Sequence, residues 1–382
     1  MTATPILQTN PKASYLAHKT DLDAAIHRTL DSGWYILGSE VQAFEQEFAT
    51  YIGTQYALGV SSGTDGIELA LRACDIGNGD IVLTASHTAV ATVAAIELAG
   101  ATPLLIDINP QTFTLDPNHL QQTLSELQKH PHLGQPKAII PVHLYGHPAD
   151  LESIQTIAQQ HQLRIIEDCS QAHGATLNDR RLGTWGDLAV FSLYPTKNLG
   201  AFGDAGIIVT QDSQLIQKLH SLRQYGWRER YISDIPGMNA RLDPLQAAIL
   251  RVKLQHLDSD NQRRQDIAQQ YNHALAHLPL QQPQTASNAS HVYHQYVIRT
   301  PERDSLRTFL KEHQIGTLIH YPLPVHQQPA YQGRVTLEGA SLPQTEQICR
   351  EIVSLPMYPQ LTDLEVQRIS DTIIDWTQQA NL

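Results

Sequence analysis

The stretch YALGVSSGTDGIELALRACDIG, residues 56–77, joins a short apolar run to an amphipathic segment through a turn of small polar residues. The apolar run at 56–60 has the length of a buried strand. Ile67, Ala70 and Leu71 recur at the spacing of one helix face, and Gly77 is a typical helix stop. The stretch therefore predicts a strand, a tight turn and a helix, the repeating unit of an α/β protein.

The same alternation continues along the chain. Further apolar runs of strand length occur at DIVLTA (80–85), TPLLIDI (102–108), AIIPVHL (138–144) and RIIEDC (164–169). Amphipathic stretches lie between them, which predicts a mainly parallel sheet covered by helices on both faces. Two later runs, DLAVFSLY (187–194) and AGIIVT (205–210), have no helix between them and predict a mixed edge of the sheet.

The sequence changes character after about residue 245. A long helical pattern is followed by shorter strand-like and helical patterns, at 244–278, 294–300, 303–314, 316–320 and 343–353. This predicts a smaller α+β domain, and 382 residues are too many for one typical core. We expect an N-terminal arm with a first helix (1–30), a large α/β domain (31–245) and a small C-terminal domain (246–382).

The composition excludes several classes of protein. A formal net charge of −12 disfavours nucleic acid or an anionic membrane as the main partner. The N-terminus has no secretory pattern and no run of about eighteen apolar residues exists, so a cytoplasmic protein is expected. Three separated cysteines and 19 histidines form no disulfide framework and no metal-binding spacing, so no metal is expected.

The turn at SSGT favours an anion site. Gly63 lets the backbone approach a ligand, and Thr64 is positioned to cap the helix that follows. Free N–H groups at a helix N-terminus attract anions. A plain capped turn without a ligand gives the same pattern.

An acidic residue follows the strand in RIIEDCSQAHG, residues 164–174. The carboxyl end of a parallel strand is where ligands bind in α/β sheets. Side-chain alternation predicts that Glu167 and Asp168 point to opposite faces, so they do not form a carboxylate pair. Asp168 is suited to hold a cation or a protonated ring nitrogen, and equally to cap the next turn.

Lys197, in FSLYPTKNLG (191–200), is one of eight lysines. Others lie in the N-terminal arm, before a strand or in helices of mixed polarity, as Lys253 does. Only Lys197 combines a preceding run as apolar as LAVFSLY with a loop rich in glycine. A poorly solvated lysine loses proton affinity and becomes a usable nucleophile.

The anion turn, the acid and the lysine together match one cofactor. Pyridoxal phosphate carries an aldehyde that reacts with a lysine, a ring nitrogen that pairs with an aspartate, and a phosphate that needs N–H donors.

With these residues in view, nearly the whole chain resembles the DegT/DnrJ/EryC1/StrS family of pyridoxal-phosphate-dependent sugar aminotransferases. The resemblance extends from SGWYILGSEVQAFEQEFA (32–49) to SLPMYP (354–359) and includes SSGTDG, GDIVLTASHTAVAT, IIEDCSQAHGA, FSLYPTKNLGAFGDAG and GMNARLDPLQAAIL. It implies the aspartate-aminotransferase-like fold, which is PLP fold type I, with a mostly parallel seven-stranded sheet and a smaller α+β C-terminal domain.

The resemblance also implies roles for individual residues. Lys197 is similar to the lysine that binds the cofactor aldehyde and moves the proton, and Asp168 to the acid on the ring nitrogen. Gln171 is similar to a polar residue beside the ring. Gly63, Thr64 and Ser192 match phosphate ligands. Asn239 matches a residue that reaches the cofactor phosphate of the neighbouring subunit, so a homodimer with shared active sites is implied.

One position departs from the family pattern. Many relatives carry an aromatic residue stacked on the ring where this chain has Ala89. We expect His87 to cover the ring instead, although His87 would also fit as a residue that only closes the strand.

The resemblance extends to the substrates. Because Lys197 is not a histidine, transamination is favoured over the related dehydration. The sequence looks most like the subgroup that aminates C3 of dTDP-linked 3-keto-6-deoxyhexoses, with L-glutamate as donor and 2-oxoglutarate as product. Expected substrate contacts are Trp34, Tyr35, Tyr225, Arg241, His320, Tyr321 and His326.

Other functions remain open at this point. One is amination at C4 of a nucleotide sugar or of a cyclitol, and another is a noncatalytic regulator that binds the cofactor. A nucleotide-binding Rossmann protein fits poorly, because no GxGxxG follows the first strand.

Overall fold

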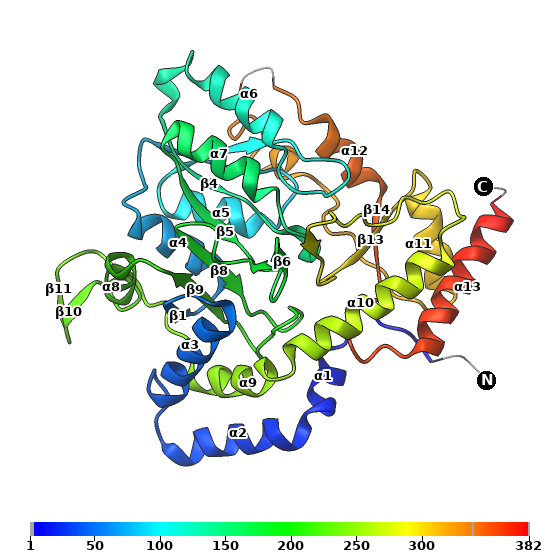
Figure 1. Cartoon of the computed structure of the whole chain (residues 1–382), viewed down its shortest axis with the longest axis horizontal. Coiled ribbons are helices and arrows are strands. Elements are labelled where there is room, and N and C mark those ends of the chain that lie inside the picture. The colour runs from blue at the N-terminus through cyan, green and yellow to red at the C-terminus, as the bar shows by residue number, and fades with distance from the viewer. Residues whose placement is uncertain (1–3, 338–339, 381–382) are drawn as a thin grey trace.

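A seven-stranded sheet forms the centre of the computed structural model, which describes residues 4–337 and 340–380 (Figure 1). The strand order is β1-β9-β8-β5-β4-β2-β3. Every apolar run expected to be a strand of the large domain belongs to this sheet. The bounds are β1 (Tyr56–Val60), β2 (Asp80–Ala85), β3 (Thr102–Ile106), β4 (Gln135–Ile140), β5 (Arg164–Asp168), β8 (Leu188–Ser192) and β9 (Gly206–Thr210).

The sheet is mostly parallel, as predicted. β2 pairs in parallel with β3 and β4, and β4–β5 and β5–β8 are also parallel. β9 is antiparallel to both β8 and β1. The expected mixed edge of the sheet is therefore present. The edge strand itself is β1, because β1 pairs with the side of β9 that does not contact β8.

Helices cover both faces of the sheet, so the strands are apolar on both sides. One face packs against α4 (Gly63–Ala73), α5 (Val90–Leu98) and α8 (Ser213–Leu222). The other packs against α3 (Ser39–Ile52), α6 (Pro117–Leu127), α7 (Leu151–His161) and α9 (Pro244–Leu254). Within β8 the alternation is direct: Val190 faces the first helix layer, and Ala189 and Phe191 face the second.

The N-terminal segment contains two helices where one was expected. These are α1 (Pro11–Ala17) and α2 (Lys19–Ser32), separated at His18. Before them the arm crosses to the far end of the molecule, where Ile6 pairs with Ile315. The arm therefore joins α1 to the C-terminal part, as Figure 1 shows for the dark blue segment.

The predicted helix at 244–278 is divided in two. α9 ends at Leu254 and α10 (Leu257–Ala274) begins after a turn at Gln255 and His256. The remaining elements of this part are β13 (Tyr296–Arg299), α11 (Arg303–Glu312), α12 (Pro343–Glu351), β14 (Ile352–Leu355) and α13 (Asp363–Gln379). β13 and β14 form an antiparallel pair, whereas residues 316–320 contribute only the isolated bridge of Leu318 to Ser354.

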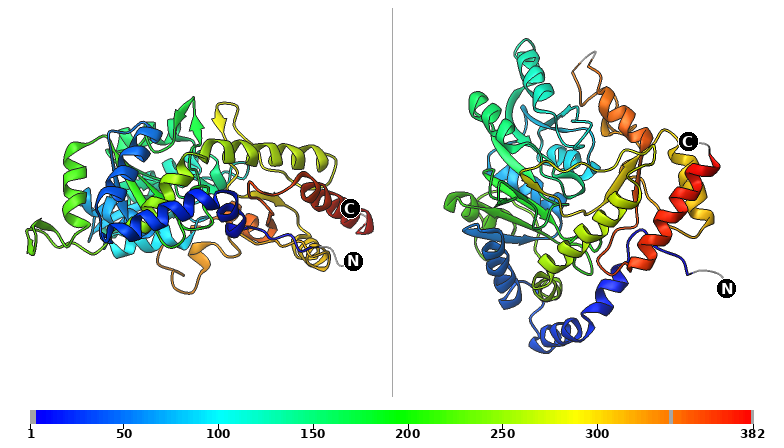
Figure 2. Two further views of the ribbon diagram at one scale, coloured as in Figure 1. Left: turned by 90° about the horizontal axis from the view of Figure 1, so that it is seen from below. Right: turned by 45° about the vertical axis from the view of Figure 1, so that its right-hand side comes forward.

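Short strands complete the fold. β6 (Thr176–Leu177), β7 (Arg180–Arg181) and β12 (Ala289–Ser290) form a small sheet. The hairpin of β10 (Trp227–Glu229) and β11 (Ile232–Ser233) projects from the end of the molecule opposite the two termini (Figure 2). Within residues 4–337 and 340–380, no helix combines the length and apolar character needed to cross a membrane.

The C-terminal part has its own apolar core, which supports the division that the sequence suggests. Ile267 of α10, Tyr296 of β13 and Ile373 of α13 belong to one buried cluster. Ala247 and Leu250 of α9 instead pack with side chains of the central sheet. We propose the same three parts, 1–30, 31–245 and 246–382, with α9 attached to the large domain through its packing.

Candidate active site

A cavity of about 330 Å³ lies at the carboxyl ends of β5 and β8. It is bounded on its other sides by the first turn of α4 and by residues 320–321 of the C-terminal part. Eight residues singled out from the sequence line it: Gly63, Thr64, Asp168, Gln171, Ser192, Lys197, His320 and Tyr321.

Lys197 lies in the loop between β8 and β9, where its N–H donates to the carbonyl of Tyr194 over 2.9 Å. Burial lowers the pKa of the Lys197 ammonium to about 8, and the negative charge of the Asp168 carboxylate partly opposes this shift. Burial also holds the pKa of both His173 and His294 below 6.5, so neither ring adds positive charge beside the lysine at neutral pH. Lys197 thus has about a tenth of its amine unprotonated at pH 7, far more than an ordinary lysine.

Asp168 is at the end of β5 and is 4% exposed. Its Oδ2 accepts a hydrogen bond of 2.8 Å from the hydroxyl of Thr92, and its Oδ1 accepts one of 3.1 Å from the N–H of Ser170. Two donors therefore fix the carboxylate at the cavity wall. Because hydrogen bonds to a carboxylate favour its charged form, this arrangement suits it to hold a cationic partner.

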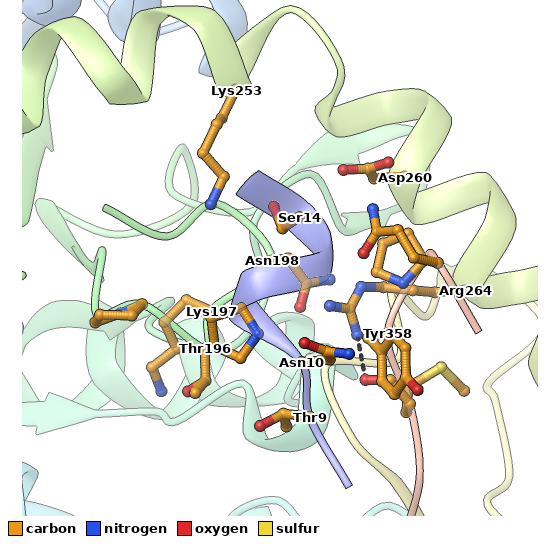
Figure 3. Close-up of a pocket in the computed structure, with 15 residues that line it drawn as sticks. Thr9, Asn10, Ser14, Thr196, Lys197, Asn198, Lys253, Asp260, Arg264 and Tyr358 are labelled. Carbon is orange, nitrogen blue, oxygen red and sulfur yellow. Dashed lines mark hydrogen bonds between the residues drawn. The ribbon is translucent and has the colours of Figure 1, made fainter. Parts of the chain in front are cut away.

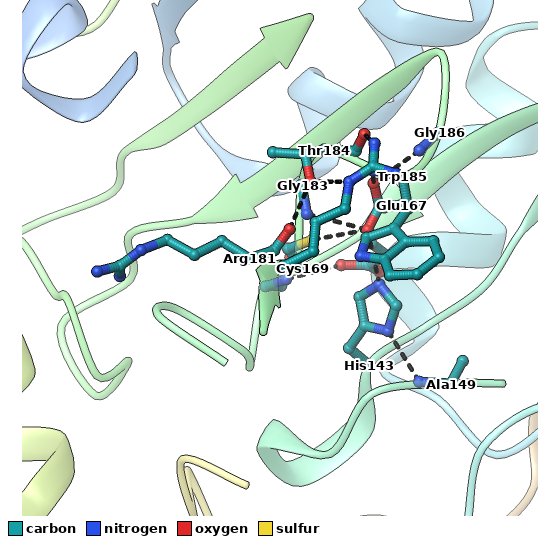
Figure 4. A network of polar contacts seen from close by, with 12 residues as sticks. His143, Ala149, Glu167, Cys169, Arg181, Gly183, Thr184, Trp185 and Gly186 are labelled. Carbon is teal, nitrogen blue, oxygen red and sulfur yellow. Dashed lines mark hydrogen bonds and ion pairs between the residues drawn. The ribbon is translucent and has the colours of Figure 1, made fainter. Parts of the chain in front are cut away.

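Glu167 points to the opposite face, as the strand alternation predicts (Figure 4). Its carboxylate accepts three backbone hydrogen bonds, at 2.9 Å from Gly183, 2.7 Å from Trp185 and 2.9 Å from Gly186. His143 lies 3.2 Å away through Nε2, and its Nδ1 accepts the N–H of Ala149. Glu167 thus fastens the 183–186 loop beneath β5.

Among the described residues, His143, Glu167 and Cys169 have the ligand types and proximity of a metal group. The backbone N–H groups of Gly183, Trp185 and Gly186 already converge on the Glu167 carboxylate, and the side chains of all three metal-ligand types are buried. These hydrogen bonds indicate that His143, Glu167 and Cys169 support the structure around β5, next to the cavity.

The turn before α4 has the features of an anion site. The helix begins at Gly63, and its cap is Ser62, whose Oγ accepts from the N–H of Asp65 over 3.1 Å. The expectation that Thr64 caps the helix is therefore wrong: Thr64 lies in the first turn. Since the first N–H groups of a helix have no intrahelical acceptor, those of Gly63 and Thr64 are available at the cavity.

Gly63 and Ser192 approach closely at this turn. A Cβ placed on Gly63 would lie 2.7 Å from the Cβ of Ser192 and 3.1 Å from its Cα. The absence of a side chain at position 63 therefore allows the Ser192 hydroxyl and the helix N-terminus to line one end of the cavity. Hydroxyl and N–H donors at one point suit a phosphate group.

Gln171 is held in one orientation at the cavity wall. Its Oε1 accepts from the N–H of Tyr145 over 2.7 Å, and its Nε2 donates to the hydroxyl of Tyr321 over 3.1 Å. Burial raises the pKa of Tyr321 to about 12. The Tyr321 hydroxyl therefore keeps its proton at neutral pH, and it accepts from Gln171, so its own hydrogen is free for a second contact.

His87 does not lie over the cavity. It is buried beneath the wall, with Nε2 2.7 Å from the Tyr145 hydroxyl and Nδ1 3.4 Å from the sulfur of Cys349. Burial lowers the pKa of His87 to about 3. Thr88 and Ala89 line the cavity at this point, so the expected stacking by His87 does not fit this geometry.

The other predicted substrate contacts lie elsewhere. Trp34, Tyr225 and Arg241 line a separate surface hollow of about 820 Å³ beside the β10–β11 hairpin. Asn239 is exposed there and accepts a hydrogen bond from Arg241 over 2.9 Å. Tyr35 is exposed near Trp34, and its hydroxyl donates to the carbonyl of Leu30. Within a single chain these five predicted ligand residues therefore lie away from the cavity that contains Lys197.

His326 also lies outside both cavities. Its Nδ1 is 2.7 Å from the Ser86 hydroxyl, and its Nε2 is 3.4 Å from Glu346. These contacts tie the 325–327 turn to the end of β2 and to α12. The prediction that His326 contacts substrate has no support in this arrangement, because its ring nitrogens are engaged by protein groups.

Several residues at the cavity were not found from the sequence. They are Thr92, Thr196, Asp204, His294 and Gln295. Thr92 had a weak signal, a lone hydroxyl in an apolar helix that directly follows a strand. His294 and Gln295 reach the site from the segment that directly precedes β13, and no local sequence pattern predicts this.

Lys197 is not the only lysine of the described residues in a poorly solvated position, although the sequence comparison of the eight lysines selected it alone. Lys253 of α9 is only 7% exposed, and burial lowers its pKa to about 8 as well. The mixed polarity of α9 predicts an exposed lysine at this position. The burial of Lys253 comes instead from the N-terminal arm and the 195–200 loop, which cover it. Lys197 is distinguished by its place at the larger cavity, beside Asp168.

Comparison with known proteins agrees with this site. Residues 17–374 match the DegT/DnrJ/EryC1/StrS aminotransferase family. The chain is 44% identical over 371 residues to dTDP-3-amino-3,4,6-trideoxy-alpha-D-glucose transaminase of Streptomyces venezuelae, covering 97% of this chain and 96% of that protein. It is 44% identical to dTDP-3-amino-3,6-dideoxy-alpha-D-galactopyranose transaminase of Aneurinibacillus thermoaerophilus, covering 94% and 96% of the two chains.

A solved structure is similar along the whole chain. The S. venezuelae protein DesV, crystallised in complex with a ketimine intermediate, superposes with a TM-score of 0.94 at 44% identity, over 98% of this chain and 99% of that one. The aminotransferase fold expected from the sequence is confirmed. This chain belongs to the DegT/DnrJ/EryC1/StrS aminotransferase family.

Proposed function

We propose that this protein is a pyridoxal-phosphate-dependent aminotransferase that converts a dTDP-linked 3-keto-6-deoxyhexose to the 3-amino-3,6-dideoxyhexose, with L-glutamate as amino donor. The observation that carries the proposal is the convergence of Lys197, Asp168 and the N-terminus of α4 on one cavity. The names of the two 44% identical transaminases support a dTDP-linked 3-amino sugar as the product.

The residues at the cavity fit the cofactor at three points. When bound, pyridoxal phosphate supplies an aldehyde that carries the amino group and a ring that delocalises the electrons released at the substrate carbon. The Nζ of Lys197 would bind the aldehyde. The carboxylate of Asp168 would accept a hydrogen bond from the protonated ring nitrogen, and the N–H groups of Gly63 and Thr64 with the Ser192 hydroxyl would hold the phosphate.

Lys197 would also move the proton. With a pKa of about 8, its Nζ can accept a proton from a substrate carbon and return it within one cavity. The Asp168 carboxylate would keep the ring nitrogen protonated while this happens. Gln171, fixed by Tyr145 and Tyr321, would lie beside the ring and limit its rotation.

We further propose a homodimer with shared active sites. The surface hollow with Trp34, Tyr225 and Arg241, and the exposed Asn239, would meet the cavity of the partner subunit. This would unite the two groups of predicted ligand residues that one chain keeps apart. Exposed aromatic side chains at the hollow, including Tyr231 at 74% exposure, are typical of an interface.

A cytoplasmic location is part of the proposal. Cys74, Cys169 and Cys349 are all free thiols, which suits a reducing compartment. The acidic net charge of −12 gives no reason to expect nucleic acid or an anionic membrane as a partner.

The alternatives can be separated by experiment. A purified sample with pyridoxal phosphate is expected to lose its visible absorption on addition of L-glutamate and to regain it with a dTDP-3-keto sugar. A noncatalytic regulator would show no change with glutamate. A C4 or cyclitol aminotransferase would respond to glutamate but regain the absorption only with a 4-keto sugar or a keto-cyclitol.

A further inference from the structure

A second, small cavity of about 30 Å³ adjoins the loop of Lys197 (Figure 3). It shares Thr196 and Lys197 with the active-site cavity. Its other walls come from the N-terminal arm and α1, from α9, from α10 and from residues 357–360. Five segments, the loop of Lys197 included, therefore surround a space large enough for two or three atoms of the size of water oxygen.

Two buried cations face a single carboxylate in this wall. Lys253 is 7% exposed and Arg264 is 5% exposed. Burial lowers the pKa of Lys253 to about 8 and of Arg264 to about 10, and it raises the pKa of Asp260. With these three groups ionised, the wall carries a net charge of +1 in the holoenzyme, where by the proposed function Lys197 is engaged by the cofactor.

The cations keep unused hydrogens. The ammonium of Lys253 donates to the carbonyl of Gly200, which occupies one of its three hydrogens. Nη1 of Arg264 donates to the carbonyls of Tyr293 and Met357, at 3.2 Å and 3.1 Å. Nε of Arg264 is buried and has no partner among the described residues, which is costly for a charged donor.

The remaining polar groups of the wall are mostly able to donate as well. They are the hydroxyls of Thr9, Ser14, Thr196 and Tyr358 and the side-chain amides of Asn10, Asn198 and Gln360. The amide of Asn198 already donates within the protein, and Oε1 of Gln360 is a buried acceptor without a partner among the described residues. Figure 3 shows Lys253 reaching down from α9 and Arg264 reaching in from α10 toward these groups. The cavity thus offers a net positive charge and a surplus of donors.

We propose that this cavity binds a small inorganic monoanion of the size of chloride, held by Lys253 and Arg264. A monoanion would balance the net charge of the wall and accept the unused N–H groups. The volume admits one such ion and is too small for a nucleotide or a sugar. A metal cation is disfavoured by two buried positive charges, and water alone leaves the charge unbalanced.

The bound anion would fasten the N-terminal arm to the loop of Lys197. Asn10 and Ser14 belong to the arm and α1, whereas Thr196 immediately precedes Lys197. An ion contacted from both sides would stabilise the packing of the arm, and with it the wall behind the catalytic loop. Removal of the ion is therefore expected to lower the stability of the folded protein.

Bromide gives the direct test, because it replaces chloride and scatters X-rays anomalously. Crystals of the wild-type holoenzyme grown without chloride and soaked in sodium bromide should show an anomalous peak in this cavity, within hydrogen-bond distance of Lys253 and Arg264. A cavity that contains only water after the soak would overturn the proposal. No variant is needed, so the test does not depend on the folding of a mutant.

A solution measurement tests the consequence for stability. The thermal midpoint of the holoenzyme is expected to be about 1–3 °C higher in sodium chloride than in sodium gluconate of equal ionic strength. The difference should vanish in Lys253→Met and persist in Lys137→Met, which removes the same charge from an exposed position on β4. Equal midpoints of the wild type in both salts, or an undiminished difference in Lys253→Met, would contradict the proposal.

Discussion

The hydroxyl of Thr92 donates a hydrogen bond of 2.8 Å to Oδ2 of Asp168. Thr92 lies in α5, in the helix layer over the sheet, and Asp168 ends β5. A second hydroxyl, that of Thr88, lies 3.0 Å from the Thr92 hydroxyl. The carboxylate expected to pair with the cofactor ring is thus oriented by a residue to which the sequence analysis gave no role.

Thr92→Val removes this donor while keeping the shape of the side chain. We expect kcat to fall about 10-fold, because a hydrogen bond to a charged group contributes about 1.5–3 kcal/mol and favours the ionised carboxylate. The pH at which the absorption of the bound cofactor changes should shift as well. Thr92→Ser, which restores the hydroxyl, should recover most of both properties.

If Thr92→Val and the wild type had the same kcat and the same spectroscopic pH profile, the hydrogen bond would have no role in orienting Asp168. A loss of thermal stability with unchanged kinetics would assign Thr92 to packing alone.

The lowered pKa of Lys197 predicts how the protein captures its cofactor. For a lysine with a pKa of about 8, half of the amine is free at that pH and the free fraction levels off above about pH 9, whereas a lysine with the ordinary pKa of 10.5 would continue to gain free amine beyond that. The rate at which the apoprotein binds pyridoxal phosphate should therefore depend on pH as expected for an amine with a pKa of about 8. Borohydride reduction and peptide mass spectrometry should locate the attachment at Lys197.

Lys253 provides the control for this prediction, because burial gives it a similar pKa. Lys197→Met should abolish capture, and Lys253→Met should leave the attachment at Lys197 intact. Attachment at Lys253 in the wild type, or a capture rate that rises steadily to pH 10, would contradict the assignment.

Gly63→Ala tests the close approach of the helix N-terminus to β8. The added methyl group would meet the Cβ of Ser192 at 2.7 Å, so the turn must shift. We expect the affinity for pyridoxal phosphate to fall at least about 10-fold and the stability to fall by about 1–3 kcal/mol. Equilibrium dialysis and denaturant unfolding measure the two effects.

Ser192→Ala is the comparison for that variant, because it removes one hydroxyl without crowding the turn. Its loss of cofactor affinity should be smaller than that of Gly63→Ala. Undiminished phosphate affinity in Gly63→Ala would show that the turn does not hold the phosphate.

His87→Ala distinguishes a structural role from stacking on the cofactor. His87 is buried against Tyr145 and Cys349, so its removal should cost about 2–3 kcal/mol of stability by leaving a cavity and removing its hydrogen bond to the Tyr145 hydroxyl. Cofactor affinity of the folded protein should change less than about 3-fold. A large loss of affinity with normal stability would restore the stacking hypothesis.

Much of the large domain was predictable because its strands are buried on both faces. Such strands appear in the sequence as continuous apolar runs, and β1 and β2 have the predicted bounds. The break between α9 and α10 was not predictable, since no glycine or proline marks Gln255 and His256. The start of β14 was predicted as the end of the helical pattern at 343–353, because no glycine or proline marks the change at Ile352.

The site was predictable where one local motif carries the chemistry. Asp168 lies at a strand end, Gly63 at a helix start and Lys197 in the loop that follows β8, so the local sequence pattern marks each of them. Lys253 was missed because burial by the N-terminal arm is a long-range property. His87 was assigned to the cavity from its distance to Ala89 along the chain, but the end of β2 turns its ring beneath the wall.

The central claim is that nitrogen passes from L-glutamate to C3 of a dTDP-linked sugar at Lys197. The most direct measurement incubates the holoenzyme with ¹⁵N-labelled L-glutamate and a dTDP-3-keto-6-deoxyhexose and analyses the product by NMR. We predict ¹⁵N bonded to C3 in the wild type and no labelled sugar with Lys197→Met. Label at C4, no labelled sugar with the wild type, or full labelling by Lys197→Met would contradict the claim.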